Sequence, residues 1–116
     1  MIMENLKLSI ARDFTVNPGV RYPEEDNFSG QEFREEHLRK LVDEALEKGV
    51  KVEIDLDGTS GLGPSFLEEA FGGLIREGYE YDDLKDLFIF KSVEIPYYVE
   101  DIMKYMKDEY ECGKRG

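Results

Sequence analysis

Residues 50–75, VKVEIDLDGTSGLGPSFLEEAFGGLI, carry the pattern that decides the fold of the chain. Over residues 50–57 apolar side chains alternate with charged ones, and this two-residue period is typical of a strand with one covered face. Residues 58–63 include three glycines, which allow a tight reversal of the backbone. Residues 64–75 then place apolar side chains at helical spacing. The stretch therefore predicts a strand, a turn and a helix, which together form half of a βαβ unit.

The start of the predicted helix has a signal of its own. Ser65 and Glu68 have the spacing of a capping box, in which each side chain satisfies a backbone N–H group at the helix end. The apolar stripe that follows has Phe71 near its centre, so we expect this side chain in the core. Functional sites of α/β proteins lie at the carboxyl ends of strands, and residues 55–65 are therefore where we expect the site.

The composition predicts one acidic, globular domain. The chain has 116 residues, of which 41% are hydrophobic and 36% charged, enough for a single modest core. Its 15 basic and 27 acidic residues give a net charge of −12. Nucleic-acid binding depends on phosphate neutralisation by Lys and Arg, so this balance argues against a nucleic-acid partner. It favours a cationic partner, or it serves solubility alone.

The sequence also indicates a compartment. It contains no run long enough to cross a bilayer and no signal-peptide pattern at its start. Its single cysteine, Cys112, cannot form an internal disulfide, which fits a reducing environment. We therefore expect a cytoplasmic protein with no membrane partner.

Before the central stretch, the sequence predicts two strands and a helix. Residues 4–14 alternate between apolar and polar side chains, and Val20 with Tyr22 can return as a short second strand after a turn. Ser29 opens a helix with a capping box of S-x-x-E spacing, and Gly49 is its expected stop.

After the central stretch, one further strand and one helix are expected. Residues 86–91 hold a continuous apolar run, as in a strand buried on both faces, and Pro96 suits the first turn of a last helix. Residues 113–116 form a basic tail. With no repeat and no linker, residues 1–116 predict a single domain. The fold class is α/β, with a small mixed sheet of about four strands and three main helices.

Two segments resemble a known family. IDLDGTSGLGPSFLEEAFGGL, residues 54–74, and FSGQEFREEHL, residues 28–38, resemble the STAS-like domain family of unknown function. That family is similar in layout to STAS domains, the modules of sulfate transporters and anti-sigma-factor antagonists. The resemblance implies a STAS-like fold and a non-enzymatic regulatory or interaction module. It also implies a protein partner, an ATPase or kinase of the GHKL type.

Ser65 has two interpretations. STAS domains place a phosphorylatable Ser or Thr at the start of the helix after a central strand, and Ser65 matches that residue by position. A phosphate there would meet the positive end of a helix and add about −1.5 to −2 charges to a partner surface, which can switch binding off. The structural alternative is that Ser65 is only an N-cap, contributing about 1 kcal/mol.

The predicted partner surface extends from the turn along the outer face of the helix. At about 100° per residue, Gly73 borders the apolar stripe and Gly72 lies opposite, beside Glu68 and Arg76. Gly72 should therefore leave a bare patch of backbone that a partner can approach. The predicted surface comprises Gly58, Thr59, Ser60, Gly61, Ser65, Glu68, Gly72 and Arg76.

An enzymatic alternative rests on Asp55 and Asp57. The run D-L-D-G-T resembles the first motif of haloacid-dehalogenase-type phosphatases, in which the first Asp is the nucleophile and Mg²⁺ ligand and the second is a general acid/base. Two carboxylates at a strand end can hold Mg²⁺. That family needs several further strands, however, whereas the sequence after Thr59 predicts one.

Other chemistry has little support in the sequence. His37 is the only histidine, so neither a metal site nor a Ser-His-Asp triad is expected. The glycine-rich turn lacks the G-K-[ST] ending of a P-loop. We therefore expect no cofactor, no resident metal and no enzymatic activity. The sequence leaves the oligomeric state open.

Overall fold

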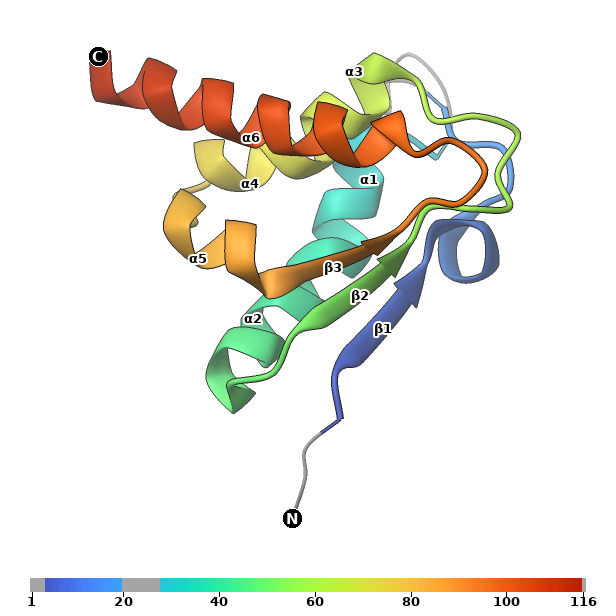
Figure 1. The fold of residues 1–116 in the computed structure, drawn as a ribbon, viewed down its shortest axis with the longest axis horizontal. Helices are drawn as coiled ribbons and strands as arrows, with labels where there is room; N and C mark the ends of the chain where they lie inside the picture. Colours follow the sequence, from blue (N-terminus) through green and yellow to red (C-terminus); the bar gives the residue numbers. More distant parts are fainter. Residues whose placement is uncertain (1–3, 20–27, 116) are drawn as a thin grey trace.

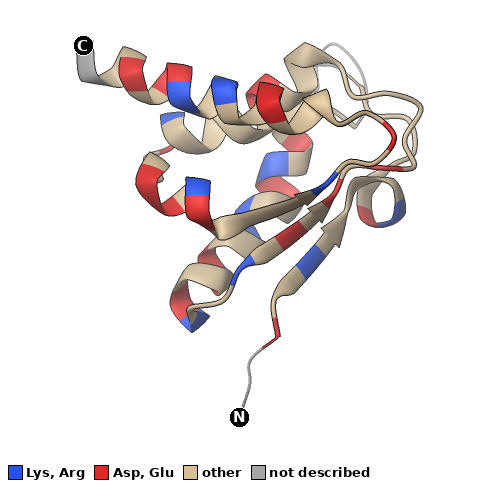
Figure 2. Cartoon of the chain, in the orientation of Figure 1, with Lys and Arg blue, Asp and Glu red and all other residues tan. Residues whose placement is uncertain are grey.

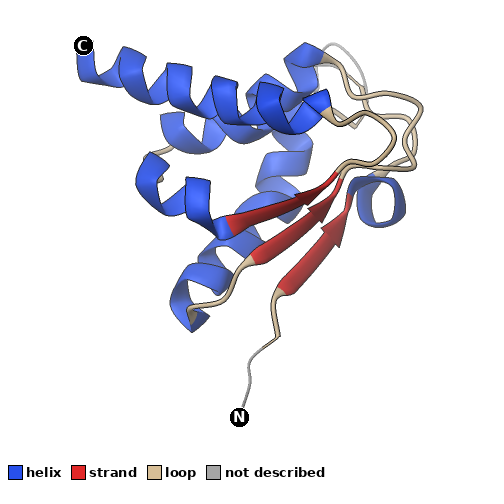
Figure 3. Cartoon of the chain, viewed as in Figure 1, coloured by secondary structure: helices blue, strands red, loops and turns tan. Residues whose placement is uncertain are grey.

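Three parallel strands form a small sheet, and the α-helices lie on one side of it, whereas one short helical turn stands at the end of the first strand (Figure 1, Figure 3). The computed structural model describes residues 4–19 and 28–115 of the chain. The strands stand in the spatial order β1-β2-β3, with β2 paired in parallel to both neighbours. They are β1 Leu6–Ser9, β2 Val52–Asp55 and β3 Phe88–Lys91.

The helical segments include short π-helical stretches, labelled η. In chain order the segments are η1 Ile10–Phe14, α1 Gly30–Phe33, η2 Arg34–Leu38, α2 Arg39–Lys48, α3 Pro64–Leu67, η3 Glu68–Gly72, α4 Gly73–Arg76, α5 Tyr81–Leu87 and α6 Tyr97–Arg115. The segments α1, η2 and α2 follow one another without a break, as do α3, η3 and α4, so each trio forms one continuous helix. Among the described residues, no helix has the length and apolar composition that a membrane span requires.

Both ends of the first continuous helix follow from the sequence. Ser29 is its N-cap, and the Ser29 hydroxyl accepts a hydrogen bond of 3.1 Å from the Glu32 N–H group, as the S-x-x-E spacing predicts. Gly49 ends the helix with φ 70°, a left-handed conformation in which other residues are strained. Both predictions are confirmed.

The sheet topology explains why one face is covered and the other is open. Parallel strands need long crossover connections, which are almost always right-handed. Because the order β1-β2-β3 never reverses direction, such crossovers bring the connecting helices to the same face, where Figure 3 shows them. The described strands therefore also lack the reversal at which doubly wound folds open a ligand crevice.

The core lies between the covered face of the sheet and the two continuous helices. Val52 and Ile54 of β2 are fully buried, and the Phe71 ring of η3 packs edge-on against Phe88 and Phe90 of β3. The predicted burial of Phe71 is confirmed. The largest fully buried side chains are Phe33, Phe66, Phe71, Ile10, Leu38, Ile54, Leu56, Leu67, Leu74, Leu84, Ile102 and Met106.

The sheet differs from the expected mixed sheet of about four strands. The described residues hold three strands, all parallel, and the strand predicted around Val20 and Tyr22 lies outside them. The first strand ends at Ser9, earlier than predicted. The backbone turns there because the Asp13 carboxylate accepts the Ser9 N–H group at 2.8 Å and the Ser9 hydroxyl accepts the Arg12 N–H group at 3.1 Å.

The region around β3 also differs from the prediction. Residues 81–87 form helix α5, which the sequence pattern does not predict, so the expected set of three main helices is not confirmed. The strand that follows is not buried on both faces, since the Ile89 side chain is 43% exposed. Its exposed side belongs to the open face of the sheet, which no described helix covers.

Candidate functional site

At the carboxyl ends of the strands, two loops are hydrogen-bonded to each other. The β2–α3 loop contains Asp57, whose carboxylate accepts the N–H groups of Val93 and Glu94 in the β3–α6 loop at 3.1 and 2.9 Å. In return, the Glu94 carboxylate accepts the Gly58 N–H group at 2.6 Å. These three bonds fix the two loops relative to one another.

The β2–α3 loop is held on its other flank as well. The Ser60 N–H group donates to the Val16 carbonyl at 2.7 Å, and the Leu62 N–H group donates to the Tyr98 hydroxyl of α6 at 2.9 Å. Gly58, with φ 90°, has a left-handed backbone that favours glycine. The loop therefore has a defined shape before any partner binds.

Three exposed apolar side chains stand on segments that are hydrogen-bonded to this loop. Val16, Val93 and Tyr97 are 53%, 75% and 59% exposed. The backbones of Val16 and Val93 bond to the loop directly, and Tyr97 precedes Tyr98, which does so through its hydroxyl. We call Val16, Val93 and Tyr97 the loop-edge patch. Exposed apolar side chains on neighbouring segments are the kind that interaction surfaces use, and tyrosine is enriched in such surfaces.

Ser65 lies beside this loop at the start of α3, and it is exposed. The N-cap is Gly63, which has no side-chain hydrogen bond to offer, and Pro64 takes the first helical position. Proline suits that position because its φ angle is fixed and it lacks an N–H group. The helix therefore begins before Ser65, and the predicted capping box between Ser65 and Glu68 is wrong.

Glu68 and Arg76 bind each other and the neighbouring helix. Arg76 Nη1 lies 2.7 Å from Glu68 Oε2 and 3.2 Å from Glu109 Oε2 of α6, and Arg76 Nη2 lies 2.7 Å from Glu69 Oε2. The hydrogen bond with Glu68 is the main cause that raises the pKa of Arg76 above its ordinary value. Helix α6 packs against η3 and α4 here, with Glu68 half-buried and Arg76 exposed beside it.

Gly72 and Gly73 are both buried, so the prediction of bare, approachable backbone at Gly72 is wrong. The Glu68 carboxylate lies over Gly72, where an added Cβ would come within 2.8 Å of Oε2. An added Cβ on Gly73 would collide with Nη1 of Arg34. The two glycines therefore make room for charged side chains of the protein itself.

The buried Arg34 guanidinium accounts for the π-helical turn at η3. Arg34 Nη1 donates to the Glu69 carbonyl, and Arg34 Nε lies 2.8 Å from Glu77 Oε2. In η3 the Gly73 N–H group bonds to the Glu68 carbonyl, five residues back. This longer reach leaves the Glu69 carbonyl available to Arg34. The arginine thereby ties the two continuous helices together.

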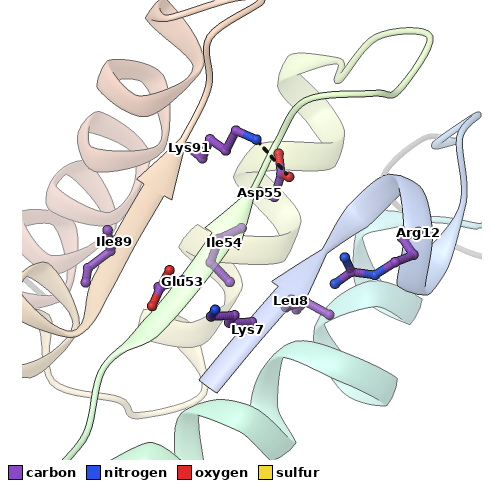
Figure 4. Close-up of a pocket in the computed structure, with 8 residues that line it drawn as sticks. All are labelled: Lys7, Leu8, Arg12, Glu53, Ile54, Asp55, Ile89 and Lys91. Atoms are coloured by element: carbon purple, nitrogen blue, oxygen red, sulfur yellow. Dashed lines mark ion pairs between the residues drawn. The ribbon is translucent and has the colours of Figure 1, made fainter. Parts of the chain in front are cut away.

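Asp55 and Asp57 are engaged in structural contacts. Both oxygens of Asp57 accept backbone N–H groups of the β3–α6 loop. Asp55 accepts the Asp57 N–H group at 2.9 Å with one oxygen, and its other oxygen lies 3.7 Å from Lys91 Nζ (Figure 4). Within the described part of the chain, no group of three or more His, Cys, Asp or Glu side chains could hold a metal ion. These contacts lend no support to the magnesium-dependent alternative.

The structure divides the predicted site residues between two places. Those of the turn, together with Ser65, border the loop-edge patch, and those farther along the helix lie next to α6. The patch itself was missed, because an apolar residue in a short loop fits a core as well as a surface. Its one signal in the sequence is that Val93 and Tyr97 flank Pro96 in the short connection before the last helix.

A family model matches more than half of the chain. The family is described as a STAS-like domain of unknown function, and the match covers residues 29–97. The matched range runs from the N-cap of α1 to the first residue of α6, and it contains the β2–α3 loop and Ser65. Neither the curated proteins nor the solved structures gave a match.

Proposed function

The chain belongs to the family of STAS-like domains of unknown function, and we propose that it is a regulatory module that binds another protein. The proposed contact surface is the β2–α3 loop with the loop-edge patch and Ser65. It includes the turn residues Gly58, Thr59, Ser60 and Gly61.

The observation that carries this proposal is that the exposed apolar side chains stand on loops that are already fixed. Association costs free energy when loops must be ordered, and the backbone hydrogen bonds that the carboxylates of Asp57 and Glu94 accept lower that cost here. Burial of a large apolar side chain contributes about 1.5–3 kcal/mol. The loop-edge patch therefore supplies both a driving force and a rigid frame.

Ser65 is the proposed switch of this surface. Its side chain is exposed at the start of α3, and α3 packs beside α6, whose first residue is Tyr97. A phosphate on Ser65 would add about −1.5 to −2 charges next to the patch. A partner that covers the patch would then have to desolvate this charge, so phosphorylation weakens binding.

The class of partner follows from the family resemblance. By that resemblance, STAS domains bind a partner kinase of the GHKL ATPase type or belong to transporters, and we propose a partner of the first kind. The single cysteine, Cys112, fits the cytoplasm as the place where the two proteins meet.

Quantitative affinity purification from the native cell tests the surface. The double variant Val93→Ser and Tyr97→Ser removes the two most exposed residues of the patch, and Leu46→Ser is the matched control. Leu46 is 43% exposed on α2, which lies far from these loops in Figure 1. We expect a protein that wild type and control capture equally and that the double variant captures at least about tenfold less. Equal capture by all three would contradict the proposed surface.

A second pair of variants tests the switch. Ser65→Ala should capture the partner as wild type does, whereas Ser65→Asp should lose it, and mass spectrometry of the native protein should find phosphate on Ser65. Equal capture by both variants would reject the switch and leave the contact surface standing.

A further inference from the structure

The open face of the sheet has no cover among the described residues. Its side chains come from all three strands: Lys7 on β1, Glu53 and Asp55 on β2, and Ile89 and Lys91 on β3 (Figure 4). Each of them is exposed or half-buried. Parallel sheets almost always have both faces covered. This open face is therefore the exception that needs a cover, and it is separate from the loop-edge patch.

The charge on this face differs from that of the whole molecule. The chain has a net charge of −12, and acidic residues crowd its helices, whereas the strands carry both signs (Figure 2). Around the open face, Lys7, Arg12 and Lys91 stand against Glu53 and Asp55. This near balance makes it a surface at which two copies of an acidic chain repel little.

The strand register leaves one pair of charges available to a partner. Asp55 and Lys91 already lie 3.7 Å apart within the chain. Lys7 has no ion-pair partner among the described residues, and Glu53, its neighbour across the strands, accepts a long hydrogen bond of 3.4 Å from Asn5. Lys7 and Glu53 are thus the opposite charges that a second molecule can meet.

We propose that the open face binds a second copy of the chain about a two-fold axis that runs along the strands, between β1 and β2. Rotation about such an axis leaves every residue at the same height along the strands. Because Lys7 and Glu53 are at the same height, Lys7 of each copy then lies over Glu53 of the other, and the ion pair forms twice. A shallow hollow of about 160 Å³ that these residues line receives the opposing side chains.

The proposed contact is small. With the axis between β1 and β2, only these two strands of each copy face the other copy. Two strands of four residues, spaced about 4.8 Å apart, bury less than the roughly 1,200 Å² at which weak and transient contacts give way to stable ones. The dimer therefore forms only at high concentration.

Sedimentation equilibrium of the whole chain, from about 10 μM to about 1 mM, tests the dimer. The average mass of the wild type should rise toward twice the monomer mass. Lys7→Glu and Glu53→Lys should each stay at the monomer mass, because each brings like charges together. Lys40→Glu is the matched control for charge: it makes the same change in net charge as Lys7→Glu, at an exposed position of α2 on the covered side. It should dimerise as wild type does.

Mixing the two single variants separates a contact between copies from an effect within one copy. In an equimolar mixture of Lys7→Glu and Glu53→Lys, both ion pairs form again across the contact, one as in the wild type and one with its signs exchanged, so the mixture should dimerise again. A mixture that stays monomeric overturns the proposal, as does a single variant that dimerises. A wild type that stays monomeric up to the highest concentration overturns it without reference to any variant.

Discussion

Ser29 and Ser65 both begin an S-x-x-E sequence near the start of a continuous helix, but they have different roles. The Ser29 hydroxyl is buried and accepts the Glu32 N–H group, whereas Ser65 is exposed and follows the capping residue. Ser29→Ala should lower the free energy of unfolding by about 0.5–2 kcal/mol, and Ser65→Ala should change it by less than about 0.5 kcal/mol. Urea denaturation of the two variants measures the difference. An equal loss in both would mean that Ser65 caps its helix.

Truncation of Phe71 should lower the stability of the core strongly. Its side chain is fully buried and its ring packs against those of Phe33, Phe88 and Phe90. Phe71→Ala should cost about 3–5 kcal/mol, a large share of the stability of a domain of this size. A thermal melt checks this, with Tyr97→Ala as the exposed aromatic control. A melting temperature close to that of wild type would place Phe71 outside the core.

At the scale of the element, Gly72 and Gly73 in the continuous helix α3–η3–α4 allow the stability effects of two neighbouring substitutions to be compared. An added Cβ on Gly73 collides with the buried Arg34 guanidinium, whereas on Gly72 it meets the end of the flexible Glu68 side chain. Gly73→Ala should therefore cost about 3 kcal/mol, because Arg34 must leave its buried partners. Gly72→Ala should leave stability unchanged or raise it by up to about 1 kcal/mol, since alanine favours a helix. Chemical denaturation measures the free energy of unfolding of both variants. Equal losses of stability would show that Arg34 is not held against Gly73.

Local signals predicted the elements that depend on neighbouring residues. The alternation over residues 50–57 predicted β2, which covers Val52–Asp55, and Ser29 and Gly49 predicted the ends of the first continuous helix. Where two local signals compete, the prediction failed: Pro64 outweighs Ser65 at the second helix start. The π-helical turn depends on Arg34, which is 35 residues away from Glu69 in the chain. A contact over that separation leaves no periodic trace in the sequence.

At the scale of the whole molecule, the sequence predicted the class of fold, and the place it predicts for the site is the place of the proposed contact surface. The carboxyl ends of the strands do carry the β2–α3 loop and Ser65. The open face was not predicted, since the run FIFK of β3 is as apolar as a strand buried on both sides. Whether the Ile89 side chain lies on the covered or the open face of the sheet depends on the side to which the crossover helices pass. That side is a property of the whole sheet.

The contacts of Asp57 between the two loops bear on the enzymatic alternative. Both carboxylate oxygens of Asp57 accept N–H groups of the β3–α6 loop, which gives this side chain a structural role in holding the loop. The purified protein should therefore show no Mg²⁺-dependent hydrolysis of generic phosphate monoesters. A colorimetric phosphatase assay checks this. Turnover in the wild type that disappears in Asp55→Asn would favour the enzymatic function over the regulatory one.

The most direct measurement of the central claim is a photo-crosslink from the loop-edge patch in the native cell. A photoreactive phenylalanine analogue replaces Tyr97 in one protein and Leu46 in a matched control, since both side chains are exposed. We predict a covalent adduct with one other protein from position 97 and none from position 46. Equal adducts from both positions, or an adduct from position 46 alone, would contradict a partner surface at the carboxyl ends of the strands.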